Sequence, residues 1–474
     1  MNLGLVLETL SDYRPTGREA AIGEVVIDSR AATPGSLFIA FKGEQADGHA
    51  YIGEAFERGA ALALAQRDVS GPFARLDARR SVTDQLEAGD LPAGPICLRV
   101  EDTLAALQKL AGAWRDRFPD VRVIGITGSV GKTTTKELIA SVLERRFQTL
   151  KSAGNLNNEI GLPLTLLKLR PWHRRAVLEM GMYAEGEIRL LCELARPQVG
   201  VVTLVGAVHM ERLGSIEAIA AAKRELIEAL PPAPEGVAVL NRDDPLVMAM
   251  AEHTQARIVT YGLEEGADLW ADQISSMGLE GIRFRLHYGS EVIQVQAPLL
   301  GRHSVQTALR ATAIGLLEGL SWDEIIAGLH GLSSQLRLVV SSGPKSSIIL
   351  DDTYNSSPES AVAALNLLAD LNGRRIAVLG DMLELGPVEE ESHRLVGRRA
   401  REVADVLVAV GELGHLIGDE AREAGMAADD VLYATDSESA AALLREMIRP
   451  ADVILIKASR GARLDRLVSA LEAG

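Results

Sequence analysis

The stretch Gly125-Ile-Thr-Gly-Ser-Val-Gly-Lys-Thr-Thr134 decides the fold, because it joins an apolar run to a periodic one. The run before it, residues 121–127, is typical of a buried parallel strand. The helix predicted over residues 132–145 carries its apolar side chains on one face: Leu138, Ile139, Val142 and Leu143. A glycine-rich turn between strand and helix points backbone N–H groups at a phosphate, and the helix dipole favours that anion. The pattern therefore predicts a phosphate-binding loop.

The loop also supplies the side chains that a nucleoside triphosphate needs. Lys132 would reach the terminal phosphates, and the Thr133 hydroxyl would hold Mg²⁺. The common form G-x-x-x-x-G-K-[ST] fails at Ile126, and a shorter G-x-x-G-K-T-T form is present instead. A glycine-rich turn without a ligand is the alternative. The residues expected to bind the nucleotide are Gly128, Ser129, Val130, Gly131, Lys132, Thr133 and Thr134.

The composition favours a globular protein with ordinary cores. The chain has 474 residues, which suggests about three domains, and 47% of them are hydrophobic. This apolar fraction excludes a mainly disordered chain, and the net charge of −16 argues against nucleic acid or an anionic membrane as partner. Isolated Cys97 and Cys192 exclude a disulfide framework. Since no membrane-length apolar run or signal-peptide pattern is present, we expect a cytoplasmic protein.

Strands and helices alternate over most of the chain, which predicts an α/β fold with parallel sheets. We expect three domains, over residues 1–101, 102–331 and 332–474. Residues 68–95 are polar, and we interpret them as a surface excursion. The predicted strands cover residues 24–27, 36–42, 121–127, 176–180, 199–205, 236–240, 348–351, 376–380, 406–410 and 453–457. The predicted helices of the central part cover residues 104–114, 132–145, 215–230 and 305–315.

An acidic and a histidine side chain follow two of these strands. Glu179 lies near the end of strand 176–180, and His209 follows strand 199–205. Ligands of α/β sheets bind beyond the carboxyl ends of strands, so both residues are candidate metal ligands beside the phosphate loop. A structural histidine is the alternative for His209.

A run of amides follows the helix predicted over residues 132–145. Asn155, Asn157 and Asn158 stand within four positions, and such a run suits recognition of carboxylate, phosphate or sugar oxygens. A polar turn before the next helix is the alternative. Asn241, after strand 236–240, is a weaker candidate, because the Asp-Asp-Pro sequence that follows it also suits helix capping.

Lys223 is a lysine within an apolar stripe. On the helix predicted over residues 215–230, its neighbours at helical spacing are apolar: Ile216, Ile219, Leu226, Ile227 and Leu230. One interpretation is a lysine whose stem covers the edge of the core while its ammonium reaches water. The other is a lysine held in the interior, modified so that it no longer carries a positive charge. Spacing alone leaves both open.

Together these residues resemble the Mur ligase family, and the resemblance extends over nearly the whole chain. The segments that carry it are Asp28-Ser-Arg30, Phe41-Lys-Gly43, Asp47-Gly-His49, the loop 127–134, Gly154-Asn-Leu-Asn-Asn-Glu-Ile-Gly161, Glu179-Met-Gly-Met182, His209, Gly214-Ser215, Ala222-Lys223, Asp351-Asp-Thr-Tyr-Asn-Ser-Ser-Pro358 and Gly380-Asp-Met-Leu-Glu-Leu-Gly386. The resemblance implies a small α/β UDP-binding N-terminal domain, a central phosphate-loop ATPase domain with a parallel sheet, and a Rossmann-like C-terminal domain.

The resemblance also implies an ATP-dependent amide ligase of peptidoglycan synthesis. ATP would convert a substrate carboxylate into an acyl phosphate, which an amine then attacks. Residues 351–358 and 380–386 are most similar to the member of the family that joins D-alanyl-D-alanine to a UDP-MurNAc-tripeptide. These two molecules and ATP are the expected partners, and we expect a monomer without nucleic-acid or membrane partners.

The catalytic and metal sets are implied by the same resemblance. Thr133 and Glu179 would ligate one Mg²⁺, and His209 would ligate a second. Lys223 matches the lysine that the family carbamylates, and a carbamate would suit both a hard cation and the interior position. The expected catalytic residues are Lys132, Glu179, His209 and Lys223.

The remaining implied roles concern substrates. The UDP group would be held by Ser29, Arg30 and Lys42. The muramoyl substrate would face Asn157 and Asn158. The nucleotide would contact Asn241, Thr307, Asp352, Tyr354 and Asn355, with Arg337 reaching the phosphates on domain closure. The dipeptide would lie near Lys457, Ser459 and Arg460.

The chain departs from the family pattern in three segments. The usual G-R-H-N-x-x-N-A is Gly301-Arg-His-Ser-Val-Gln-Thr-Ala308 here, so Ser304 and Thr307 replace two asparagines, at least one of which is associated with adenine. Thr307 retains a hydroxyl that can hydrogen-bond the base. The usual Y-N-A-N-P is Tyr354-Asn-Ser-Ser-Pro358, and K-G-S-R is Lys457-Ala-Ser-Arg460.

Three other functions remain as alternatives. The first is the preceding ligase, which adds the third amino acid to a UDP-MurNAc-dipeptide, although a D-N-P-R motif expected of a diaminopimelate-adding member is missing. The second is a folylpolyglutamate synthase, which the UDP-like N-terminal block disfavours. The third is a Mur-like protein that binds nucleotide without making amide bonds.

Overall fold

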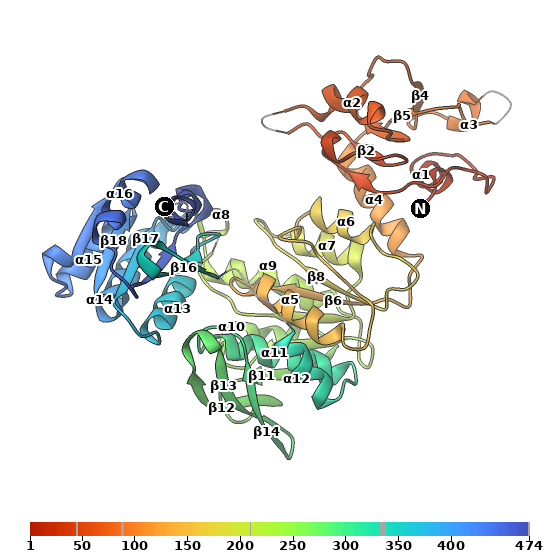
Figure 1. The fold of residues 1–474 in the computed structure, drawn as a ribbon. Coiled ribbons are helices and arrows are strands. Elements are labelled where there is room, and N and C mark those ends of the chain that lie inside the picture. The colour runs from red at the N-terminus through yellow and green to blue at the C-terminus, as the bar shows by residue number, and fades with distance from the viewer. Residues whose placement is uncertain (44–45, 87–89, 209, 332–337, 473–474) are drawn as a thin grey trace. The chain divides into compact units, whose positions relative to one another are not determined.

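The computed structural model describes residues 1–43, 46–86, 90–208, 210–331 and 338–472, and its strands form three sheets (Figure 1). His209 and Arg337 therefore lie outside the described residues. Contacts divide the chain into two compact units. One comprises Met1–Val123, Leu150–Met180 and Arg189–Pro197, and the other comprises Ile124–Thr149, Gly181–Ile188 and Gln198–Gly474. Within the described residues, no helix is long and apolar enough to cross a bilayer.

The N-terminal sheet has five strands in the order β1-β2-β3-β5-β4, and every pairing is parallel. Its strands are β1 (Val25–Val26), β2 (Leu37–Ile39), β3 (Leu62–Ala65), β4 (Ala74–Asp77) and β5 (Ile96–Arg99). The interpretation of residues 68–95 as a surface excursion is wrong in part, because β4 belongs to the sheet. Only Leu76 of β4 is buried, which is why an edge strand with so polar a sequence escaped prediction.

The central sheet has nine strands in the order β14-β13-β12-β11-β10-β9-β6-β8-β7. They are β6 (Arg122–Thr127), β7 (Thr149–Lys151), β8 (Arg175–Glu179), β9 (Val199–Val202), β10 (Val237–Asn241), β11 (Arg257–Gly262), β12 (Leu269–Ser276), β13 (Ile282–Tyr288) and β14 (Glu291–Ala297). The four predicted strands of this region are present as β6, β8, β9 and β10. The predicted α/β fold is therefore confirmed, but the antiparallel run β12–β14 was not predicted.

The C-terminal sheet has six strands in the order β15-β16-β20-β17-β18-β19, and all but β15 run parallel. They are β15 (Val339–Ser342), β16 (Ile348–Asp352), β17 (Arg375–Gly380), β18 (Val406–Val410), β19 (Val431–Ala434) and β20 (Val453–Lys457). Successive side chains of a strand point to opposite faces, so the apolar strands supply two cores. Leu379, Leu407 and Leu455 face one core, whereas Val378, Val408 and Ile456 face the other.

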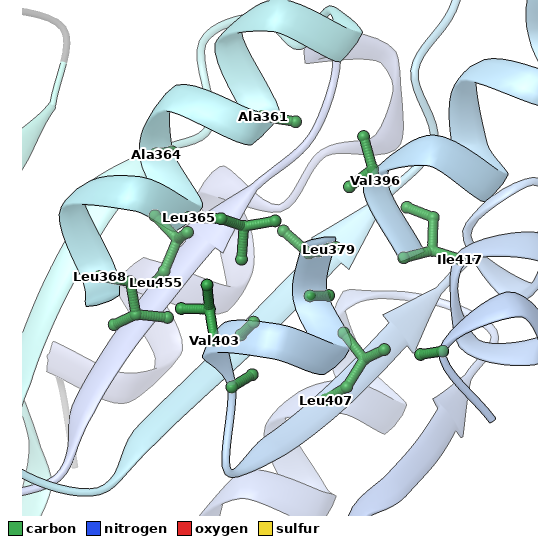
Figure 2. Packing of buried hydrophobic residues seen from close by; sticks show 14 of the residues in the cluster. Ala361, Ala364, Leu365, Leu368, Leu379, Val396, Val403, Leu407, Ile417 and Leu455 are labelled. Carbon is green, nitrogen blue, oxygen red and sulfur yellow. The ribbon is translucent and has the colours of Figure 1, made fainter. Parts of the chain in front are cut away.

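Helices cover both faces of this C-terminal sheet. Figure 2 shows the first core, where α13, α14 and α15 contribute Leu365, Val396 and Ile417. On the other face, α16 and α17 contribute Leu444 and Leu467. These helices are α13 (Pro358–Ala369), α14 (Glu389–Val403), α15 (Gly414–Glu423), α16 (Ser437–Met447) and α17 (Asp465–Glu472).

The remaining helices include the four predicted in the central part, present as α4, α5, α9 and α11. In chain order, the remaining α-helices of the described residues are α1 (Leu3–Leu10), α2 (Ile52–Glu57), α3 (Val82–Gln85), α4 (Thr103–Arg115), α5 (Lys132–Leu143), α6 (Gly161–Leu166), α7 (Glu187–Ala195), α8 (Met210–Leu213), α9 (Ile216–Glu228), α10 (Pro245–Met248), α11 (Ser304–Leu317) and α12 (Trp322–His330).

We expect Leu365→Ala to lower the free energy of unfolding of the C-terminal domain by ~2–5 kcal/mol, because it leaves a cavity in a core where Leu365 is fully buried. Urea denaturation followed by circular dichroism measures this change. The matched control is Leu395→Ala on α14, where the side chain is 42% exposed and the expected change is about 0.5 kcal/mol or less. Equal effects of the two substitutions would contradict the assigned core.

Candidate active site

The predicted phosphate loop lies between β6 and α5, and its two positive-φ glycines make its shape possible. Gly128 has a φ of 139° and Gly131 a φ of 83°, both unfavourable for other residues. A Cβ on Gly128 would lie 1.9 Å from Thr203 Oγ1, so no side chain fits there. The helix α5 begins at Lys132, so its first N–H groups face the loop. The loop thus has the backbone arrangement that holds an anion.

Three hydrogen bonds that involve side chains fix the loop to the segment after β9. Thr203 Oγ1 donates to the Val130 carbonyl at 2.7 Å. Ser129 Oγ donates to the Gly206 carbonyl at 3.0 Å and accepts from the Gly206 N–H at 2.9 Å. The Ser129 hydroxyl, predicted to bind nucleotide, therefore holds the loop in place. Lys132 Nζ donates to the Gly128 carbonyl at 2.8 Å, so the lysine folds back over the loop.

A cavity of about 520 Å³ opens beside the loop. One part of its wall is polar and belongs to the loop, and another part is apolar and includes Leu279, Pro298 and Leu300. Such a division suits a ligand with a phosphate end and a flat apolar end. Of the predicted site residues, the cavity brings together Ser129, Val130, Gly131, Thr133, Thr134, Thr307, Asp352, Asn355 and Lys457.

Lys457 is the central cation of the C-terminal side of this cavity. It is 2% exposed, and its Nζ donates to Asp352 Oδ2 at 2.6 Å and to the Asn355 carbonyl at 2.8 Å. These contacts join the ends of β20 and β16. His303, which sequence reasoning assigned no role, also lines the cavity.

Ser459 and the loop after β17 lie next to this cation. Ser459 Oγ accepts from the Leu383 N–H at 2.9 Å, and its own N–H donates to the Asp381 carbonyl at 2.9 Å. Sequence segments 351–358, 380–386 and 457–460 thus meet at one edge of the C-terminal sheet. Arg460 and Tyr354 are exposed there.

Lys223 lies in the interior. It is 2% exposed and ranks among the largest fully buried side chains. Burial lowers the pKa of its amine well below the usual value, and the charge of Lys132 lowers it further. The interpretation in which the ammonium reaches water is therefore wrong. An uncharged amine at this position is a nucleophile, whereas an ammonium is not.

Glu179 is the fully buried last residue of β8. Its Oε1 accepts a hydrogen bond from Asn157 Nδ2 at 2.8 Å, and its N–H donates to Ser152 Oγ at 3.2 Å. The structure therefore brings Glu179 and Asn157 together. Asn158 differs, because its Oδ1 accepts from the Gly161 N–H at 2.9 Å at the start of α6. The alternative of a polar turn before the next helix therefore applies to Asn158.

Asn241 is buried, and its hydrogen bonds hold parts of the chain together. Its Nδ2 donates to the Thr203 carbonyl at 3.1 Å, and its Oδ1 accepts from the Asp243 N–H at 3.1 Å. It ties the end of β10 to the end of β9, and it is not among the residues that line the cavity.

The N-terminal candidates lie in two different environments. Ser29 is buried and donates to Glu54 Oε2 at 2.9 Å. Arg30 is exposed and pairs with Asp28 at 2.7 Å, and this hydrogen bond lowers the pKa of Asp28 to about 2. Lys42 is also exposed. Arg30 and Lys42 are therefore accessible cations, whereas Ser29 already has a partner.

The described residues contain no group of three His, Cys, Asp or Glu side chains arranged to hold a metal ion. The expected metal set is not of that kind, since it includes a threonine and a modified lysine, and His209 lies outside the described residues. Glu179, Thr133 and a carbamate on Lys223 would all offer oxygen, which is the donor that Mg²⁺ prefers. The described members of the set therefore fit Mg²⁺ by their chemistry.

The fold and the loop define a phosphate-loop α/β protein with three sheets. Family models match its three parts: "Mur ligase family, catalytic domain" over residues 21–115, "Mur ligase middle domain" over residues 126–315, and "Mur ligase, glutamate ligase domain" over residues 337–460. The chain belongs to the Mur ligase family, as the sequence motifs predicted.

Several relatives share one name, UDP-N-acetylmuramoyl-tripeptide–D-alanyl-D-alanine ligase. The protein of Bacillus subtilis is 37% identical over 96% of this chain and 94% of its own length. That of Escherichia coli K12 is 35% identical over 96% and 95%. Among solved structures, MurF from Acinetobacter baumannii covers 99% of this chain and 98% of its own, with 29% identity and a TM-score of 0.84. MurF ligase from Thermotoga maritima in complex with ADP has 28% identity and a TM-score of 0.78, over 95% and 97%.

We expect Gly128→Ala to destabilise the central domain by ~1–3 kcal/mol and to weaken nucleotide binding, because a Cβ at this φ collides with Thr203. Thermal unfolding with and without ADP measures both effects. Gly53→Ala on α2 is the control, since a Cβ there meets nothing within 4 Å. A Gly128→Ala protein with unchanged stability and ADP affinity would contradict the described loop.

Proposed function

We propose that this chain is an ATP-dependent ligase that joins D-alanyl-D-alanine to UDP-MurNAc-tripeptide. The observation that carries the proposal is the 35–37% identity, over 95–96% of the chain, to relatives that bear this ligase's name. The cavity beside the phosphate loop supports it, because its polar and apolar walls fit a nucleotide.

The reaction must first activate a carboxylate, which is a poor electrophile. A carboxylate oxygen of the tripeptide attacks the γ-phosphorus of ATP, and ADP leaves, which gives an acyl phosphate. The amine of D-alanyl-D-alanine then attacks the acyl carbon, the C–O bond to phosphate breaks, and the amine loses a proton. Both steps need reacting atoms held in line and water kept out, so positioning and charge stabilisation are the enzyme's main tasks.

The phosphate loop and the C-terminal residues would hold ATP between them. Backbone N–H groups of residues 128–134 and the Lys132 ammonium face the phosphates. Asp352 and Asn355 line the same cavity and are fixed by Lys457. Tyr354 and Arg337 belong to the same proposed nucleotide site.

We also propose two Mg²⁺ ions, held by Thr133, Glu179, His209 and a carbamylated Lys223. When bound, the ions neutralise phosphate charge, so that an anionic carboxylate can approach ATP. The contribution of the chain itself is clearest at Lys223. Burial lowers the pKa of its amine and so favours the uncharged form. That amine would add to CO₂, lose a proton and become an anionic carbamate. Asn157 orients the Glu179 carboxylate by the hydrogen bond to Oε1.

The peptide substrates would contact the remaining predicted residues. Arg30 and Lys42 present accessible cations for the UDP diphosphate, with Ser29 beside them. Asn157 would face the muramoyl group, and Lys457, Ser459 and Arg460 would receive the dipeptide. The protein would work as a monomer in the cytoplasm, with domains over residues 1–101, 102–331 and 332–474.

The proposal predicts phosphate release that requires every substrate. We expect release with ATP, Mg²⁺, UDP-MurNAc-tripeptide and D-alanyl-D-alanine, and a pentapeptide product by mass spectrometry. Omission of the dipeptide should reduce release to the background. Release that instead requires UDP-MurNAc-dipeptide and a free amino acid would move the chain to the preceding ligase, and no release in either mixture would favour a binding protein.

Lys223→Met should abolish turnover without weakening the fold. For the unmodified lysine, the unfolded state binds more protons than the folded state between the lowered folded-state pKa and the usual value of 10.5, so native stability rises with pH across that window. The Met variant lacks this penalty and should be at least as stable at pH 7. Initial rates and thermal unfolding measure the two effects, with the exposed Lys168→Met as control. Near-normal turnover of Lys223→Met would contradict the proposed carbamate.

A further inference from the structure

Arg310 is a buried cation directly behind the phosphate loop. It lies on α11 and is 4% exposed. A Cβ placed on Gly131 would lie 3.6 Å from its Nη2. α11 packs against α5, the helix that begins at the loop. The guanidinium therefore lies within van der Waals distance of the loop, on the side of the loop that faces α11.

The acceptors that the described residues offer Arg310 are neutral. Nη1 donates to the Tyr261 hydroxyl at 3.0 Å, and Nη2 donates to Thr307 Oγ1 at 2.8 Å. The Arg310 Cζ lies 5.4 Å from the centroid of the Tyr261 ring. Nε is buried without a hydrogen-bond partner within the described part of the chain. Hydroxyls and an aromatic ring hold the guanidinium in position, but they do not neutralise it.

Such a charge is costly unless something balances it. An arginine does not give up its proton inside a protein, and a buried charge that faces only neutral groups keeps its desolvation cost. Arg115 provides a comparison, since it is 3% exposed and donates to the carbonyls of Ala195, Phe118 and Val121. Each of its three guanidinium nitrogens thus donates to a carbonyl. Arg310 has an unused donor and lies beside a loop shaped for an anion.

We infer that Arg310 is a positioning residue that acts through the phosphate loop. Its fixed positive charge behind Gly131 stabilises the loop when the loop holds the β-phosphate of a nucleotide. The inference rests on the proposed nucleotide site. Across the low-dielectric interior, the charge favours the anion-bound loop far more than it would in water. Arg310 does not line the cavity, whereas Thr307, which it orients, does.

The test compares ADP with AMP, because AMP lacks the phosphate that the loop would hold. Calorimetry on the full chain gives both dissociation constants for the native protein, Arg310→Met, Arg310→Lys and the control Arg115→Met. We expect Arg310→Met to reduce the ADP-over-AMP preference about tenfold or more, while the AMP affinity changes less than about threefold. Arg310→Lys keeps the charge and should retain most of the preference. Thermal unfolding without nucleotide should show Arg115→Met destabilised and Arg310→Met unchanged or more stable.

Each other result has a defined meaning. An unchanged ADP-over-AMP preference in Arg310→Met overturns the inference, as does an equal loss of ADP and AMP affinity. Destabilisation of Arg310→Met equal to that of Arg115→Met would show a merely structural arginine. A native protein without preference for ADP over AMP would instead refute the proposed phosphate site itself, so the two failures are distinguishable.

Discussion

The hydrogen bond from Thr203 Oγ1 to the Val130 carbonyl fixes the phosphate loop to the strand beside it, and much of the central domain is arranged around Thr203. The Thr203 N–H donates to the Thr127 carbonyl, which continues the pairing of β9 with β6 into the loop. Its carbonyl accepts from Asn241 Nδ2 and from the Tyr261 hydroxyl, which come from the ends of β10 and β11. One residue thus connects the carboxyl ends of four neighbouring strands. A loop held on so many sides can keep its N–H groups aimed at an anion before the anion arrives, which is the condition for strong electrostatic stabilisation.

Periodicity predicted the parallel strands and the helices that pack on them, because burial on both faces leaves an unbroken apolar run. It failed where a strand is buried on one side only. In β13, Ile282, Phe284 and Leu286 are buried and alternate with charged or polar residues. β4 is weaker still, since one of its four side chains is buried. The alternation in β13 is the period-two pattern of a half-buried strand, which a search for unbroken apolar runs misses. β4 belongs to its sheet mainly through backbone pairing, which leaves little trace in the order of apolar residues.

The sequence predicted which residue types form the candidate site, but not how deeply each side chain is buried or which partner it contacts. The apolar neighbours of Lys223 were visible in the sequence, yet spacing could not tell an ammonium in water from one in the core. Asn157 and Asn158 are chemically identical neighbours, and only the fold shows that one reaches Glu179 while the other caps α6. Arg310 gave no signal at all, because an arginine in a helix is ordinarily on the surface. Its meaning depends on the approach of Gly131 and Tyr261, which are distant in the sequence.

Three basic side chains near the loop, Lys132, Lys223 and Arg310, differ in whether they keep their charge. Lys132 folds over the loop, Lys223 is buried where the charge of Lys132 lowers its pKa, and Arg310 lies behind Gly131. The buried charge of Arg310 raises the energy of the empty state, because the interior solvates that charge poorly. The fold tolerates this because its apolar cores, such as the two on the C-terminal sheet, supply stability elsewhere. A polyanion at the loop offsets this cost, so the electrostatic cost of the empty site becomes selectivity for a charged nucleotide over neutral molecules of similar shape. The same argument explains why Lys223 can give up its charge while Arg310 cannot: a lysine that loses its proton becomes a nucleophile, and an arginine that keeps its proton remains a fixed point of the field.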